Sequence, residues 1–171
     1  GYKALFRAGK VQEAGCWAHA RRKFFEAHKL NRSEIAKLAL DWIARRSEIE
    51  REVQVVDDPQ RLAIRQARSR PLLEEFKAWL MEQRVELAAA DVTAKAIDYT
   101  LKRWGALIVH VNDARVPVDN NAVENMMRPI ALGRKNWLFI GSQQAGERAA
   151  ILMSLIESAK LNGHDAWAYL K

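Results

Sequence analysis

The sequence lacks the features that mark secreted and membrane-spanning proteins. Its 171 residues include a single cysteine, Cys16, which excludes an internal disulfide framework and fits a reducing cytoplasm, where we expect the protein to be located. No apolar run approaches the roughly 20 residues that cross a bilayer, so we expect no membrane partner. The N-terminal residues have no signal-peptide anatomy and no initiator methionine, which favours a segment of a longer protein.

Several widespread catalytic motifs are missing as well. There is no glycine-rich phosphate loop, no GxSxG and no HExxH. Cys16 and His19 are two possible metal ligands at close spacing, but a structural zinc site needs a full tetrahedral set, and no other histidine has a cysteine companion. We therefore expect a buried thiol and a hydrogen-bonded histidine at these positions.

The composition is that of a globular, basic protein. Hydrophobic residues make up 49% and charged residues 29% of the chain, the net charge is +7 and the pI is near 9.8. This balance favours a polyanionic partner, with nucleic acid ahead of an anionic membrane surface. Basic residues gather in three clusters: Arg21 to Lys23; Arg61, Arg65, Arg68 and Arg70; and Arg128, Arg134 and Lys135. The second cluster is either a solvated helix face or a surface that follows phosphates.

Apolar spacing predicts a mainly helical chain with short breaks. Three short stretches differ: 11–17 and 137–140 are predicted strands, and 107–109 is either a helix end or a strand. Pro71 is expected to kink or divide the long helix in which it lies. The predicted helices start at Ala18 and then cover about 33–56, 59–85, 91–104, 121–132, 143–161 and 166–170.

One stretch, Val116 to Pro129, combines several functional signals. Asn121 is a predicted N-cap, and Glu124 then falls in the first turn of a helix, followed by Arg128. This pattern fits an ordinary capping box, in which both residues serve the helix end. It also fits an exposed carboxylate that binds a metal ion facing a phosphate. The residues alone leave both interpretations open.

Three separate motifs resemble one protein family. The first is Gly15-Cys16-Trp17-Ala18-His19-Ala20-Arg21-Arg22-Lys23-Phe24. The second runs from Asp119 through Glu124 and Arg128-Pro129 to Arg134-Lys135-Asn136-Trp137 and Ser142, and the third is Ser154 to Gly163. Their order and content resemble bacterial DDE transposases of the insertion-sequence sixty-six family. The resemblance spans nearly the whole chain.

The resemblance implies a partial ribonuclease H-like core interrupted by an α-helical insertion. The chain would be mainly α with a few short strands. Residues 1–32 would end the first part of the core, 33–104 would form the insertion, and 105–171 would complete the core. Glu124 would be the last acidic residue of the catalytic triad. In such enzymes three carboxylates hold two divalent ions, usually magnesium, which promote cleavage and joining of DNA strands.

The resemblance also implies partners and a limitation. The first two acidic residues would lie upstream of Gly1, so we expect this segment alone to be inactive and to bind magnesium poorly. Expected partners are DNA, as transposon ends and target, and a second copy of the chain. The expected DNA contacts are Arg128, Arg134, Lys135 and Asn136, with Asn121, Cys16 and His19 in supporting roles. Two alternatives are a non-catalytic nucleic-acid-binding module and a helical self-association domain.

Overall fold

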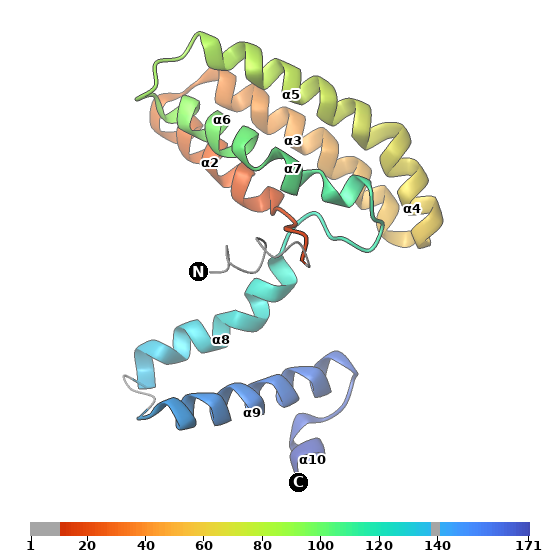
Figure 1. Cartoon of the computed structure of the whole chain (residues 1–171), viewed down its shortest axis with the longest axis vertical. Helices are drawn as coiled ribbons and strands as arrows, with labels where there is room; N and C mark the ends of the chain where they lie inside the picture. The colour runs from red at the N-terminus through yellow and green to blue at the C-terminus, as the bar shows by residue number, and fades with distance from the viewer. Residues whose placement is uncertain (1–10, 138–140) are drawn as a thin grey trace. The chain divides into compact units, whose positions relative to one another are not determined.

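The computed structural model describes residues 11–137 and 141–171, and all regular structure within them is helical (Figure 1). Within α8, the side chains of Ala122, Ile130 and residues 134–137 fall outside the description. The described elements are α2 (Trp17–Asn31), α3 (Glu34–Glu52), the 3-10 helix η1 (Val53–Val55), α4 (Asp58–Ile64), the π-helix η2 (Arg65–Ser69), α5 (Arg70–Val85), α6 (Val92–Lys102), α7 (Trp104–Leu107), the 3-10 helix η3 (Val109–Val111), α8 (Asn121–Trp137), α9 (Gln143–Leu161) and α10 (Ala166–Leu170).

Side-chain caps begin the helices where the sequence predicts them. Ser33 Oγ accepts a hydrogen bond from the amide of Ala36 at 3.2 Å, and Asp57 Oδ1 accepts one from Gln60 at 2.9 Å. Asp91 likewise caps α6. Each cap satisfies an amide that the first helical turn leaves without a partner, so the breaks between the helices are fixed locally.

The chain divides into two compact units, residues 1–120 and 121–171. In the first unit α2, α3, α5 and α6 form a four-helix bundle in which each helix contacts two of the others. Three aromatic side chains meet in its core: the ring centroids of Trp17 and Trp104 are 5.9 Å apart, and both rings lie within 6.4 Å of Phe76. Such edge-on and tilted contacts suit aromatic quadrupoles.

The predicted interruption of the long middle helix is present, but it precedes Pro71. The π-helix η2 separates α4 from α5, and the amide of Arg70 donates to the carbonyl of Arg65, five residues earlier. Pro71 has no amide hydrogen to donate, so the helical ladder next to it is already incomplete. The extra residue of the π-turn changes which side chains face the bundle.

The predicted strand at 11–17 is wrong, and the one predicted at 137–140 lies mostly outside the described residues. Residues 11–16 have no regular structure, because the amides of Gly15 and Trp17 donate to two distant carbonyls and not to a neighbouring strand. Residues 107–109, predicted as a helix end or a strand, continue from the end of α7 into η3. Trp137 ends α8, while residues 138–140 lie outside the described part. With no strand in residues 11–137 and 141–171, the expectation of a partial ribonuclease H-like core with short strands is not supported.

The second unit consists of α8, α9 and α10. The prediction of α9 and α10 is confirmed at both ends, with Ser142 and Asp165 as caps. The apolar side chains of α9 are mostly not covered: Leu152 is 52% exposed, and Ala159 is the only buried side chain among those described in this unit. The predicted domain boundaries after residues 32 and 104 stay predictions, although α2 shares one hydrophobic core with α3, α5 and α6.

Candidate functional site

In the first unit, the first motif contacts α7 and the segment just before the second motif. The amide of Trp17 donates to the carbonyl of Val118 at 3.0 Å, which joins the start of α2 to the segment that leads toward α8. The indole Nε1 of Trp17 donates to the carbonyl of Leu107 at 2.9 Å. The amide of Gly15 donates to the carbonyl of Ala106 at 2.8 Å. The first motif therefore holds α7 and the segment just before the second motif against the bundle.

Gly15 is required at this junction. A Cβ atom there would lie 2.9 Å from the backbone nitrogen of Leu107 and 3.1 Å from the carbonyl carbon of Ala106. These are backbone atoms of α7, which cannot rotate away as a side chain can. The absence of a side chain at Gly15 is what lets the two backbones approach.

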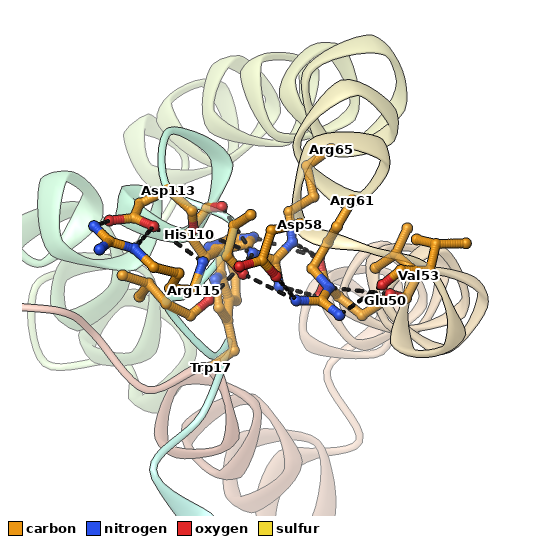
Figure 2. A network of polar contacts seen from close by, with 12 residues as sticks. Trp17, Glu50, Val53, Asp58, Arg61, Arg65, His110, Asp113 and Arg115 are labelled. Carbon is orange, nitrogen blue, oxygen red and sulfur yellow. Dashed lines mark hydrogen bonds and ion pairs between the residues drawn. The ribbon is translucent and has the colours of Figure 1, made fainter.

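Arg65 organises the segment that follows α7 (Figure 2). Its Nε and Nη2 donate to the two carboxylate oxygens of Glu50 at 3.0 and 2.8 Å. Its Nη1 donates to the carbonyls of His110, Ala114 and Val116 at 3.0 to 3.2 Å. One guanidinium thus forms an ion pair with a buried carboxylate. It also donates hydrogen bonds to carbonyls of a loop that has no regular pattern of backbone hydrogen bonds.

Neighbouring side chains extend this attachment. Arg61 donates from Nε to the carbonyl of Val53 at 3.1 Å and from Nη2 to that of Val56 at 2.9 Å. Gln66 Nε2 donates to the carbonyl of Val111 at 3.0 Å. These bonds fix the α4–η2 corner to both η1 and η3.

His110 is buried in this region and is neutral. Burial, helped by the positive charges of Arg46 and Arg65, lowers the pKa of His110 from 6.5 to about 3. Its Nδ1 lies 2.9 Å from the carbonyl of Leu107 and donates to it, which leaves Nε2 without a hydrogen. Nε2 lies 3.9 Å from Glu50 Oε1, but a neutral ring forms no ion pair at that distance.

Arg46 completes the buried polar network, which we define as Arg46, Glu50, Arg65 and His110. Burial lowers the pKa of Arg46 to about 10, while Glu50 and Asp119 act in the opposite direction. Its guanidinium carbon lies 5.0 Å from the centroid of the Trp17 ring, a cation–π distance. Asp119, which opens the second motif, therefore interacts electrostatically with the bundle.

The residues predicted for catalysis lie in the second unit. Asn121 is the first residue of α8, Glu124 is in its first turn, and both are exposed. Arg128 is exposed one turn beyond Glu124, and the spacing of four residues places both on one face of the helix. Arg134, Lys135 and Asn136 belong to α8, but their side chains lie outside the described part.

Metal ligands do not gather around Cys16 and His19. Cys16 precedes α2 as its N-cap residue without a capping bond, and both side chains are half-buried. Across residues 11–137 and 141–171 no group of three His, Cys, Asp or Glu side chains could hold a metal ion. In the same part of the chain, no helix is both long and apolar enough to cross a membrane.

The buried polar network was not predicted from the sequence. The sequence places Arg65 in one basic cluster with Arg61, Arg68 and Arg70, whereas in the structure Arg65 is 3% exposed and Arg68 pairs with Glu52. The available signal was in α3, where Arg46 and Glu50 stand four residues apart on the face that also carries Ile43. Charged residues on an otherwise apolar face indicate buried pairing.

The chain is similar to one protein family and to several longer proteins. A family model described as "Transposase IS66 family" matches residues 1–148. The uncharacterized protein y4hP of Sinorhizobium fredii (strain NBRC 101917 / NGR234) is 37% identical over 179 residues, which cover 98% of this chain and 32% of that protein. The uncharacterized protein y4jD of the same organism is 40% identical over 175 residues, which cover 99% of this chain and 34% of that protein. The chain thus spans about a third of the length of these relatives. No solved structure matches it significantly.

Proposed function

The chain belongs to the Transposase IS66 family, and from this membership we propose that it forms part of a DNA transposase. The observation that carries the proposal is the family match over residues 1–148, which includes the Gly15–His19 segment and Glu124. In the proposed role the whole protein binds transposon ends and target DNA, and it cleaves and joins phosphodiester bonds. The basic net charge of +7 supports a polyanionic partner.

Glu124 is the proposed acidic residue of the catalytic centre within this chain. Its exposed position in the first turn of α8 supports this role, because a carboxylate buried against apolar side chains could not reach a metal ion or DNA. Arg128, one turn later, is the proposed phosphate contact. Asn121, at the start of the same helix, is the proposed positioning residue for Glu124.

The described residues do not fit two magnesium ions by themselves. Magnesium prefers near-octahedral oxygen coordination, and no cluster of three acidic, His or Cys side chains is present in the described part of the chain. We therefore assign no catalytic step to this segment alone, and Glu124 is proposed as one contributing carboxylate. The purified chain should leave supercoiled plasmid intact in magnesium, and efficient nicking that Glu124→Gln abolishes would contradict this assignment.

DNA binding provides the direct test of the proposed contacts on α8. Wild type, Arg128→Gln and Arg134→Gln should be titrated onto fluorescent duplex DNA over a series of salt concentrations. Loss of one phosphate contact should lower the slope of log K against log salt by about 0.9. Arg148→Gln is the matched control, because Arg148 is an exposed arginine on α9 of the same unit. Equal losses in all three variants would contradict the proposed contacts.

A further inference from the structure

Helix α2 has an excess of positive charge that the other long helices of the bundle lack. It contains four basic residues (Arg21, Arg22, Lys23 and Lys29) and one acidic residue, Glu26, and it has no acidic residue in its first turn. By the same count α3 has four basic and five acidic residues, and α5 has three of each. The positive excess is therefore larger on α2 than on either of these two helices.

The positive residues of α2 lie away from the bundle core. Trp17, Ala20, Phe24 and Ala27 are buried on one side of the helix, which packs against α3 and α6. At 100° per residue, Arg22 and Lys29 fall on the opposite side, and both are exposed. Phe25 lies between them along the helix and is 48% exposed, so part of its ring surface faces solvent.

Among the described residues, most of these positive charges have no carboxylate partner. Several arginines elsewhere in the first unit have carboxylate partners: Arg65 pairs with Glu50, Arg84 with Asp98, and Arg103 with Glu13. On α2 only Lys23 has a carboxylate partner, Glu26 at 3.8 Å, among the ion pairs of the described residues. Arg21 instead lies 6.0 Å from the ring centroid of Phe25. Arg22, Lys29 and the C-cap residue Arg32 remain available to an external anion.

We propose that the outer face of α2, defined as Arg21, Arg22, Phe25, Lys29 and Arg32, is a second DNA-binding surface that follows the backbone of a duplex. This inference rests on the proposed function and adds a contact surface in the first unit. Arg22 and Lys29 are seven residues apart, about 10 Å along the helix, which is the axial length of about three base pairs. Arginine forks suit phosphate oxygens, and Phe25 offers an apolar surface to the sugar between them.

The test compares two double variants that remove the same charge. Arg22→Gln/Lys29→Gln changes the outer face of α2, and Lys77→Gln/Lys95→Gln changes exposed lysines on α5 and α6 that have no ion pair among the described residues. Binding to one duplex of random sequence is measured by fluorescence anisotropy at several salt concentrations. The α2 variant should lose about tenfold in affinity, and its salt slope should fall by about 1.8, which is 0.9 for each lost contact. The control should keep the wild-type slope.

The outcomes separate this surface from the one on α8. If the α2 variant binds like wild type while Arg128→Gln binds more weakly, the α2 surface is overturned and the proposed function stands. If both double variants lose affinity equally, net charge alone explains binding and the α2 surface is again overturned. If wild type binds no duplex DNA, or binds only duplex RNA, the proposed function fails together with this surface. Circular dichroism of each variant verifies that the helices are intact.

Discussion

At the scale of single residues, the buried polar network is the most consequential feature of the molecule. Arg65 and Glu50 are 3% and 6% exposed, and every donor that Arg65 directs at the loop has a carbonyl partner. A buried ion pair adds little net stability when complete, because the desolvation of two charges opposes their attraction. Removing one partner is different, because the other charge then stays buried alone.

Arg65→Gln should therefore destabilise the first unit by about 3–5 kcal/mol. The variant leaves the Glu50 carboxylate without its bidentate partner and leaves the carbonyls of His110 and Val116 with fewer donors. Urea denaturation followed by circular dichroism measures the loss. Arg68→Gln is the control, because its pair with Glu52 is solvent-exposed and should change stability far less. Similar losses in both variants would contradict the role given to burial.

His110 should make stability depend on pH. Its folded pKa of about 3 lies below the ordinary value of 6.5, so between these values the unfolded chain binds a proton that the folded chain does not. The full stability is present above about pH 6.5 and decreases as the pH falls toward 3. Between pH 7.5 and pH 5 the contribution of His110 should be a loss of about 2 kcal/mol.

The measurement compares wild type with His110→Gln in urea at both pH values. The other histidines, His19, His28 and His164, are present in both proteins, so their contributions cancel in the difference. The variant should lose less stability than wild type on acidification. An identical pH dependence in the two proteins would show that His110 is protonated in the folded state.

At the scale of elements, the contact between the Gly15 segment and α7 depends on the missing side chain. Gly15→Ala places a Cβ against backbone atoms of Leu107 and Ala106 and should cost about 1–3 kcal/mol of stability. Gly105→Ala is a matched control inside α7, because nothing lies within 4 Å of its added Cβ. This control should be neutral or stabilising by up to about 1 kcal/mol, since alanine favours a helix over glycine. Thermal unfolding of the two variants gives the comparison, and a stabilised Gly15→Ala would refute the close approach.

The sequence predicts these elements well where the signals are local. Ser33, Asp57, Asp91, Ser142 and Asp165 all cap the helices that their positions indicate, because a cap needs only an oxygen within a few residues of a free amide. Short apolar runs are ambiguous. Val109 belongs to a 3-10 helix although its β-branched neighbours equally suit a strand, and long-range contacts decide the outcome.

The site is less predictable for the same reason. The position of Glu124 in a first helical turn follows from the residues around it and is observed. The network around Arg65 joins residues from α3, η2, η3 and the loop after η3, and no periodicity relates these positions. The π-turn adds to the difficulty, because it changes the face on which Arg65 lies relative to an uninterrupted helix.

At the scale of the whole molecule, the two units differ in how much apolar surface they bury. The first has a continuous core that includes Trp17, Phe24 and Phe76, all at most 1% exposed. In the second, Ile151 and Leu161 are 60% and 72% exposed, and burial is confined to Ala159 among its described side chains. Because burial of apolar surface stabilises a fold, we expect the first unit to have the larger free energy of unfolding.

Hydrogen exchange should reveal this difference between two helices of equal length. α3 and α9 each have 19 residues, and a serine caps each of them. Amides in the middle of α3 should exchange far more slowly than those of α9, because α3 opens only when the bundle core opens. Mass spectrometry of peptides from both helices tests this, and equal protection would mean that α9 is stabilised by contacts other than those described.

The Arg65 contacts have a consequence for the order of folding. They join Arg65 to carbonyls 45 to 51 positions further along the chain, whereas helical hydrogen bonds join residues four apart. Closing such long loops costs entropy before the bond forms, so refolding from denaturant should structure the helices first and this loop late. Synthesis on the ribosome changes the situation, because Glu50 and Arg65 emerge before residues 110–116 do. In the nascent chain Glu50 and Arg65 can therefore pair before the carbonyls of residues 110–116, and the second motif after them, have been synthesised.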